Sequence, residues 1–222
     1  MNITNDKVTE YLEGLYQPLN DYLRILRADA EEQHVPIILR ETEACILNII
    51  RIKKPHRILE IGTAVGYSAL CFAAASPESE IVSLEVSEDM YRTAAGNIEQ
   101  CGLSGRIHIR LGDAVESLKE LKDSITNVDS EGFDLVFIDA AKGHYKEFWD
   151  GSIPFCRKGA VILSDNVLLK ARTASDEYVT EKRHKTSVKR MREFIKYITE
   201  LDYAETAVLS VGDGVAVSIL RG

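Results

Sequence analysis

The spacing of apolar residues along the chain changes at about residue 55. Between Asn5 and Lys54 apolar residues recur at helical intervals, with Leu12, Leu15, Tyr16 and Leu19 on one predicted face, and Val35-Pro36 interrupts the pattern. Beyond residue 55, short runs rich in β-branched residues alternate with helical stretches, and we predict strands over residues 57–61, 81–85, 107–111, 133–139 and 160–164. The pattern predicts an N-terminal helical segment, 1–54, followed by an α/β core, 55–222.

This alternation of strands and helices is typical of a parallel, doubly wound, Rossmann-like sheet. Two further strand-like runs, 204–211 and 214–220, are separated by Gly212 and Asp213, which favours a tight turn and an antiparallel hairpin at the sheet's end. Residues 124–132 are predicted to form a surface loop that is too short to separate domains. We therefore expect one α/β domain over residues 1–222.

Composition and charge narrow the class of protein. A net charge of −8 argues against binding nucleic acid over the whole surface, so any basic binding site must be a local patch. No basic and then apolar leader is present, and the longest apolar run, 69–75, cannot cross a bilayer, so a cytoplasmic protein outside the membrane is expected. No C-x-x-C pair occurs, and reduced core thiols are predicted at Cys45, Cys71, Cys101 and Cys156.

A glycine loop after the first predicted strand favours a nucleotide-like cofactor. Gly62 and Gly66 lie where the chain turns from strand to helix, and Glu85 ends the next strand, where a carboxylate can accept hydrogen bonds from ribose hydroxyls. The G-x-x-x-G spacing differs from the G-x-G-x-x-G fingerprint, which disfavours NAD. The alternative is that the two glycines only allow close helix–sheet packing and that Glu85 is a solvated strand end.

Two further carboxylates flank the predicted cofactor site. Glu60 precedes the glycine turn and suits the ammonium and sulfonium charges of S-adenosylmethionine, directly or through water, or else it orients the loop. Asp113, followed by Ala114, comes after the third predicted strand, beside the expected adenine pocket. Asp113 is equally suited to cap the helix that follows.

A predicted metal and catalytic site lies at the carboxyl ends of the fourth and fifth strands. Asp139 ends one strand, and Asp165-Asn166 follow the next, so their oxygen atoms offer a partial shell for Mg²⁺ that stays open to substrate. Taken singly, either aspartate could cap a turn instead. Lys142, expected at the start of the next helix, is a candidate general base or a stabiliser of an oxyanion, or a solvated lysine.

These residues together resemble the metal-dependent class I O-methyltransferases of the catechol and caffeoyl-CoA type, over nearly the whole chain. The resemblance is carried by residues 60–68 (EIGTAVGYS), Glu85, 112–114 (GDA), 138–142 (IDAAK), 164–166 (SDN) and 212–214 (GDG). It implies that Asp139, Asp165 and Asn166 bind Mg²⁺ and that S-adenosylmethionine is held by Ser68, Glu85, Asp113 and Asp139. It also places Ile38 over the cofactor, where the family more often has methionine.

Within this family the chain resembles most the bacterial branch that methylates 5-hydroxyuridine at the tRNA wobble position to 5-methoxyuridine. In residues 170–192, the basic segment, Lys and Arg outnumber Asp and Glu, as phosphate contacts beside an active site require. The alternative for this segment is an ordinary solvated helix face. The prediction is therefore a tRNA-binding methyltransferase.

Other functions are weighed against this one. A small-molecule catechol or caffeoyl-CoA-type O-methyltransferase fits the same chemistry, and Tyr145, Phe148 and Trp149 would then line an acceptor pocket or belong to the core. A non-catalytic binding protein would be expected to have lost part of the metal set, and a dehydrogenase would need a different glycine spacing. Amphipathic N-terminal helices favour a homodimer but serve equally to cover the core.

Overall fold

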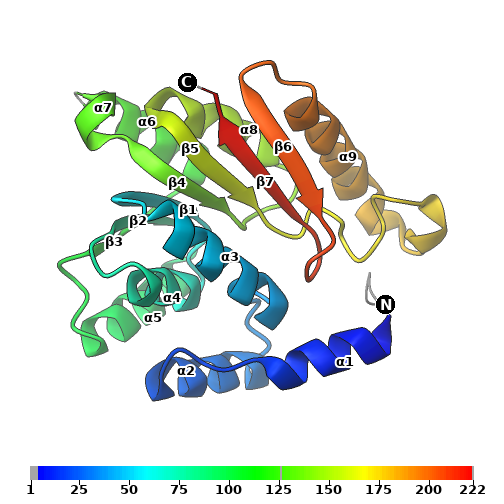
Figure 1. Cartoon of the computed structure of the whole chain (residues 1–222), viewed down its shortest axis with the longest axis horizontal. Coiled ribbons are helices and arrows are strands. Elements are labelled where there is room, and N and C mark those ends of the chain that lie inside the picture. Colours follow the sequence, from blue (N-terminus) through cyan, green and yellow to red (C-terminus); the bar gives the residue numbers. More distant parts are fainter. Residues whose placement is uncertain (1–4, 126, 222) are drawn as a thin grey trace.

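The computed structural model describes residues 5–125 and 127–221, and its centre is a seven-stranded sheet in the order β3-β2-β1-β4-β5-β7-β6 (Figure 1). The five strands β1 to β5 pair in parallel, and β7 pairs antiparallel with both β5 and β6. This confirms the predicted Rossmann-like sheet with an antiparallel end. The strands are β1 (Arg57–Ile61), β2 (Glu80–Glu85), β3 (Ile107–Leu111), β4 (Phe133–Ile138), β5 (Cys156–Ser164), β6 (Ala204–Leu209) and β7 (Val215–Leu220).

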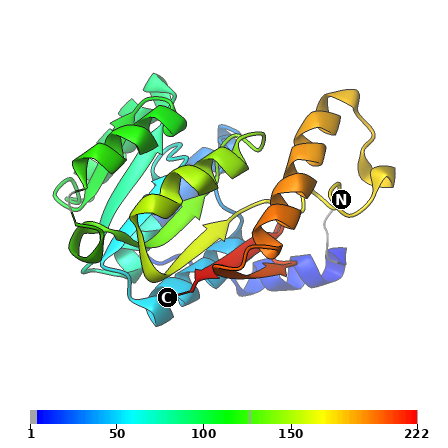
Figure 2. The ribbon, with the colours of Figure 1, turned by 90° about the horizontal axis from the view of Figure 1, so that it is seen from above.

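Helices cover both faces of the sheet (Figure 2). One face packs on α6, α8 and α9 and buries Leu59, Val136 and Ile162, while the other packs on α2, α3 and α4 and buries Ile58 and Leu135. Because both faces are covered, β4 carries an unbroken apolar run from Leu135 to Ile138 instead of an alternating pattern, whereas Glu60 interrupts the apolar residues of β1. The helices are α1 (Asp6–Leu15), α2 (Asp21–Glu32), α3 (Arg40–Lys53), α4 (Tyr67–Ala75), α5 (Glu88–Gln100), α6 (Ala114–Ser124), α7 (Val128–Glu131), α8 (Tyr145–Ser152) and α9 (Lys185–Thr199), with short 3-10 helices η1 (Ile153–Phe155), η2 (Asp176–Tyr178) and η3 (Lys182–His184).

The N-terminal helices break at two places, although the sequence predicted one break. Besides the break at Val35-Pro36, the chain leaves the helix between α1 and α2, where Pro18 lies and Asn20 caps α2 by accepting from the Leu23 N–H. α1 has no buried residue, so the predicted apolar face around Leu12 and Leu15 is exposed. Helical spacing therefore identified an amphipathic face but not what that face contacts.

Three local predictions were wrong. The hairpin turn is longer than Gly212-Asp213, because β6 already ends at Leu209 and β7 begins at Val215. The predicted loop 124–132 contains α7, apart from residue 126, which lies outside the described residues. All four cysteines are free thiols as expected, yet only Cys71 is buried and the other three are half-buried.

The helices of the described ranges are all too short or too polar to cross a membrane.

Candidate active site

The carboxyl ends of β1, β4 and β5 lie side by side and form the floor of the candidate site. The Asp139 N–H donates to the Ile61 carbonyl (2.9 Å), and the Asp165 N–H donates to the Ile138 carbonyl (3.0 Å). The strand order reverses at β1, which has β2 on one side and β4 on the other. Ligands of doubly wound sheets bind at such a switch point.

A cavity of about 850 Å³ opens at this edge. Its walls come from the loops after the parallel strands and from residues 36–39, which we call the strap. Nine of the predicted site residues line the cavity: Ile38, Gly62, Ser68, Glu85, Asp113, Ala114, Asp139, Lys142 and Asn166. Glu60 and Asp165 are fully buried and lie outside its lining.

Gly62 allows the glycine loop to cross closely over the end of β4. Its φ is +103°, and a Cβ atom built there would lie 2.1 Å from the backbone oxygen of Asp139. Both the backbone angle and the contact exclude a larger residue at this position. The glycine therefore brings the glycine loop into direct contact with the backbone of Asp139, in the predicted metal and catalytic site.

Glu85 holds the glycine loop while it lines the cavity. Its Oε2 accepts from the backbone N–H groups of Thr63 (3.2 Å) and Ala64 (2.9 Å), and its Oε1 accepts from the Ser87 N–H (2.8 Å). The side chain is therefore pre-oriented at the end of β2, where ribose recognition was predicted.

Glu60 orients the loop from behind. Its two carboxylate oxygens accept from the hydroxyls of Ser68 and Ser83, each at 2.5 Å. Burial raises the pKa of Glu60 to about 7, although the two serine bonds oppose this shift. The arrangement favours the orienting role over direct contact with a cofactor, because Ser68 stands between Glu60 and the cavity.

Asp113 combines the two roles that the sequence left open. Its Oδ1 accepts from the N–H groups of Val115 (2.9 Å) and Glu116 (3.2 Å), which caps α6. It also lines the cavity, as does Ile38, whose side chain is buried on the strap. Capping and ligand contact are therefore compatible at Asp113.

Lys142 joins the predicted catalytic residues. Its Nζ donates to Asp139 Oδ1 (2.7 Å), Asn166 Oδ1 (2.5 Å) and the Tyr145 hydroxyl (2.9 Å). It lies in the loop before α8, not on that helix as predicted. Burial alone would lower the pKa of the Lys142 amine, but Tyr145 and Asp139 raise it above its ordinary value. In this arrangement the side chain is a cation that donates to three oxygen atoms, those of Asp139, Asn166 and Tyr145.

Asp165 has an unused buried oxygen. Its Oδ1 accepts from the Asn166 N–H (2.6 Å), whereas Oδ2 is buried without a hydrogen-bond partner. Burial and the nearby Asp139 raise the pKa of Asp165 to about 8.

The oxygen atoms of Asp139, Asp165 and Asn166 suit a hard divalent cation. Two carboxylates and an amide are the ligands that Mg²⁺ prefers, and an orphaned buried carboxylate oxygen lacks the partner that such a cation would supply. No cluster of three or more His, Cys, Asp or Glu side chains placed for metal binding occurs within residues 5–125 and 127–221. A metal at this edge would therefore rely on the amide of Asn166 and on water or substrate oxygens.

A strained loop after β5 also lines the cavity; the sequence placed Lys170 in the basic segment beside the site but did not identify this backbone as part of the cavity wall. Leu169, Lys170 and Ala171 have φ values of 47°, 55° and 66°, which side chains other than glycine rarely adopt. Asp213 holds this loop, because its Oδ1 accepts from the Lys170 N–H and its carbonyl accepts from the Leu168 N–H. Leu, Lys and Ala carry no sequence signal for left-handed backbone, so only Asp213 between two glycines pointed here.

The three aromatic residues on α8 differ in role. Phe148 lines the cavity, and the Tyr145 hydroxyl donates to the Asp165 carbonyl (2.8 Å). Trp149 is a core residue, fully buried with its ring centroid 6.2 Å from that of Phe194. Only Phe148 is therefore placed to contact an acceptor.

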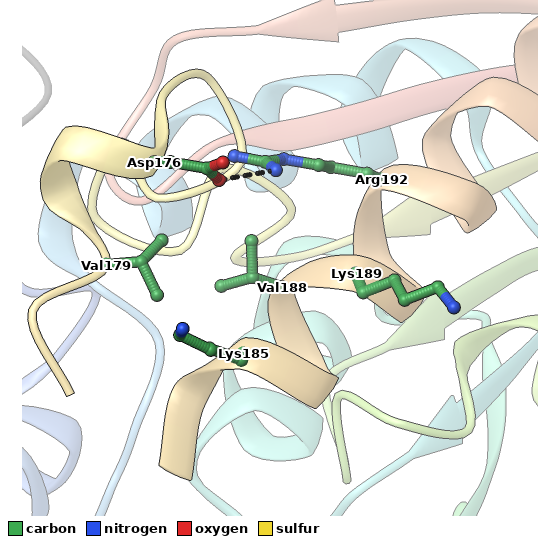
Figure 3. A pocket seen from close by; sticks show the side chains of 6 residues that line it. All are labelled: Asp176, Val179, Lys185, Val188, Lys189 and Arg192. Carbon is green, nitrogen blue, oxygen red and sulfur yellow. Dashed lines mark hydrogen bonds and ion pairs between the residues drawn. The ribbon is translucent and has the colours of Figure 1, made fainter. Parts of the chain in front are cut away.

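The basic segment carries a second, smaller cavity of about 280 Å³ between η2 and α9. Figure 3 shows Lys185 beside Val179 and Val188, and an ion pair between Asp176 and Arg192 (2.7 Å). Part of the segment's charge is neutralised in this way. Among the described residues, no ion pair engages Lys182 or Lys185.

Known proteins are similar to this chain in fold and in sequence. A family model described as O-methyltransferase matches residues 17–220. A catechol O-methyltransferase from Niastella koreensis is 27% identical over 97% of both chains. A structure described as a putative caffeoyl-CoA O-methyltransferase from Staphylococcus aureus superposes with a TM-score of 0.87 at 30% identity, covering 95% of this chain and 98% of the other. An O-methyltransferase from Bacillus cereus, solved in complex with SAH, gives a TM-score of 0.81 at 25% identity over 97% of each chain. Because the family model spans almost the whole sequence, this chain belongs to the O-methyltransferase family.

Proposed function

We propose that this protein transfers a methyl group from S-adenosylmethionine to a hydroxyl group on a ring that carries a second oxygen donor beside it. One observation carries the proposal: a single cavity joins the glycine loop, Glu85 and Asp113 to the polar set of Asp139, Lys142 and Asn166. The first group of residues offers hydrogen-bond acceptors for a nucleoside, and the second offers polar groups that would bind an acidic hydroxyl. Donor and acceptor would thus meet at the end of β4.

The cofactor half of the cavity fits an adenosyl group without phosphates. Glu85 is oriented by three backbone N–H groups and can accept from ribose hydroxyls, and Ile38 supplies an apolar cover. The SAH in the Bacillus cereus relative supports the same ligand class for this chain.

The acceptor half fits a chelated pair of oxygens. Asp139, Asp165 and Asn166 would hold a divalent cation such as Mg²⁺, and a bound cation would acidify the acceptor hydroxyl and fix both oxygens. Phe148 offers an apolar wall for the ring. A neighbouring oxygen on the acceptor is therefore part of the proposed recognition.

The reaction needs a positioned oxyanion. The acceptor oxygen attacks the methyl carbon, the O–CH₃ bond forms as the S–CH₃ bond breaks, and the electron pair stays on sulfur to give S-adenosylhomocysteine. The hydroxyl proton passes to solvent, or to Lys142 when its amine is deprotonated, before or during this step. Lys142 in its charged form would stabilise the oxyanion, and it could serve as a base only after losing its proton to solvent.

A small catechol-type acceptor is favoured by the relatives. The Niastella koreensis protein that matches over 97% of both chains is a catechol O-methyltransferase. A catechol presents two adjacent ring oxygens, as the proposed site requires. We therefore propose a catechol or caffeoyl-CoA-type phenol as the first acceptor class to test.

A second acceptor, 5-hydroxyuridine in tRNA, rests on the basic segment. Residues 170–192 hold eight Lys and Arg against three Asp and Glu in a chain of net charge −8, and Lys170 lines the main cavity. The base offers a hydroxyl beside a carbonyl, which is the same chelating pair. Phosphate contacts from Lys182 and Lys185 would then supply affinity.

One experiment separates these acceptors. Labelled S-adenosylmethionine is incubated with the protein and either catechol or tRNA containing 5-hydroxyuridine, with Mg²⁺ or with a chelator. Labelling of catechol alone supports the small-molecule function, and efficient labelling of tRNA supports the second one. No Mg²⁺-dependent labelling of either acceptor would contradict the proposed chemistry.

The tRNA function has its own control. Lys182→Glu/Lys185→Glu should weaken tRNA binding and reduce its salt dependence, while catechol labelling stays unchanged. Unchanged tRNA binding in filter assays would exclude these lysines as phosphate contacts.

A further inference from the structure

A buried polar cluster lies behind the cofactor half of the cavity and outside the catalytic set. Its members are Arg27 on α2, Glu43 on α3 and Tyr67 at the start of α4, and they are exposed to only 4%, 2% and 1%. Tyr16, between α1 and α2, adds its hydroxyl, which donates to Glu43 Oε1 (2.9 Å). The cluster therefore connects α2, α3 and the end of α1 to α4, the helix that follows the glycine loop.

The Arg27 guanidinium is the centre of this cluster. Its Nη2 donates to Glu43 Oε2 (2.7 Å) and to the backbone carbonyl of Ile38 (2.8 Å), and its Nε donates to the Tyr67 hydroxyl (3.1 Å). Tyr67 in turn donates to Glu43 Oε2 (2.9 Å), and the guanidinium carbon lies 4.6 Å from the centre of the Tyr67 ring. Burial alone would lower the pKa of Arg27, but Tyr67 and Glu43 raise it, so the charge is kept.

Two partners of Arg27 line the cavity, whereas Arg27 itself does not. Ile38 belongs to the strap, and Tyr67 forms the wall beside the glycine loop. The strap has no helical or strand hydrogen bonding of its own. Just before the strap, the Val35 N–H donates to the Ala30 carbonyl (2.9 Å). At its end, the Leu39 carbonyl accepts from the Glu43 N–H (2.8 Å). The Arg27–Ile38 bond fixes the strap between these anchors.

Burying Arg27 and Glu43 costs free energy, because both charged groups lose their contact with water. A buried ion pair often stabilises a protein no more than apolar residues of the same volume would, because both charges lose their water. Here the pair gains orientation, since a planar guanidinium can hold a carboxylate, a carbonyl and a phenol at fixed angles.

We propose that Arg27 is a positioning residue for the cofactor: it holds the strap against Tyr67 so that the adenosyl half of the cavity is preformed. The inference rests on the proposed use of S-adenosylmethionine. Loss of the bond to Ile38 would leave the strap free to move, and the cofactor would then have to order it on binding. Cofactor affinity should fall while the chemistry at Asp139 and Lys142 stays the same.

The test uses variants that avoid an unpaired buried charge. Arg27→Met/Glu43→Gln removes both charges and the bond to Ile38, and Glu31, whose Oε1 accepts from Arg27 Nη1 (3.1 Å), is exposed and keeps its ion pair with Arg40. Arg27→Lys keeps the charge but cannot make all four hydrogen bonds of the guanidinium. The matched control is Arg157→Met/Asp134→Asn, which removes another arginine–carboxylate pair (3.1 Å) at the amino end of β4, outside the cavity lining. Binding of S-adenosylmethionine and S-adenosylhomocysteine is measured by calorimetry, and KM and kcat by methyl transfer to the acceptor.

The double variant at Arg27 should raise Kd and KM for S-adenosylmethionine about tenfold, with kcat at saturating cofactor within about twofold of wild type. Arg27→Lys should recover part of this loss, and the control pair should lower the melting temperature without changing Kd. A Kd that shifts no more in the Arg27 variants than in the control overturns the inference. If the wild-type protein itself does not bind S-adenosylmethionine, the proposed function fails as well, so the two failures are distinguishable.

Discussion

Replacing Glu60 by glutamine should make the protein less sensitive to rising pH. Glu60 is fully buried, and its oxygens accept from Ser68 and Ser83. A glutamine of the same shape can accept from one serine and donate to the other, so the packing is kept. The substitution therefore isolates the effect of the charge.

The change in unfolding free energy with pH takes its sign and size from the pKa of Glu60, which burial raises from 4.5 to about 7. Below pH 4.5 the carboxyl group is protonated in both the folded and the unfolded protein, so it does not affect the free energy of unfolding. Between pH 4.5 and about 7 it ionises only in the unfolded chain, so the folded protein loses stability as the pH rises. At ~1.4 kcal/mol per pH unit, the difference of about 2.5 between the pKa values of 4.5 and about 7 gives a full loss of about 3.5 kcal/mol. Glu60→Gln has no such loss.

The assay is denaturant unfolding without cofactor and in chelator, between about pH 6 and 8.5, above the isoelectric point near 5.2. In that window the variant should gain about 1.4 kcal/mol relative to wild type, because the remainder is lost at lower pH. Shifts of other carboxyl groups, such as Asp165, cancel in the difference between the two proteins. Glu120→Gln on the exposed side of α6 is the control. A wild-type-minus-variant difference that does not change with pH would refute the raised pKa.

Three further predictions address the loop, the metal and the N-terminal helix. Gly62→Ala should lower the free energy of unfolding by ~3 kcal/mol or more, because its Cβ would clash with the Asp139 carbonyl and its φ is +103°. The control Gly96→Ala, in open space on α5, should instead stabilise the protein by about 0.5–1 kcal/mol. Equal effects of the two substitutions would contradict the close approach at Gly62. Asp165→Asn should abolish Mg²⁺-stimulated methyl transfer yet leave S-adenosylmethionine binding within about twofold, and wild-type activity that persists in chelator would contradict the metal assignment. The predicted homodimer should give a light-scattering mass near twice 24.8 kDa that Leu12→Glu/Leu15→Glu reduces to the monomer value, since both side chains are exposed on α1; a monomeric wild type would exclude it.

The fold could be predicted because the signals for it are local. Alternating strand and helix runs and the glycine at the first turn predicted the doubly wound sheet and placed both ends of six of the seven strands to within two residues. The exception is β5, which begins at Cys156 instead of residue 160. Asp113 and Asn20 cap helices as their residue types favour. These features depend on neighbours within a few positions along the chain.

The candidate site was predictable only as far as strand ends reveal it. Parallel strands carry their carboxyl ends to one edge, so Asp139, Lys142 and Asn166 were expected to meet, and they do. The sequence could not show that Glu60 lies behind Ser68, or that Asp165 Oδ2 is buried without a hydrogen-bond partner. Burial depends on residues that are far away along the chain.

The tertiary structure alone decided the contacts between the N-terminal helices and the cavity. Arg27 and Tyr67 are 40 residues apart, and their hydrogen bond reflects how α2 packs on α4. The left-handed turn at Leu169 and Lys170 likewise exists because Asp213, from the β6–β7 loop, holds it. Residue type and spacing determine which local structures are favourable, but pairings across the fold depend on packing that no single stretch of sequence contains.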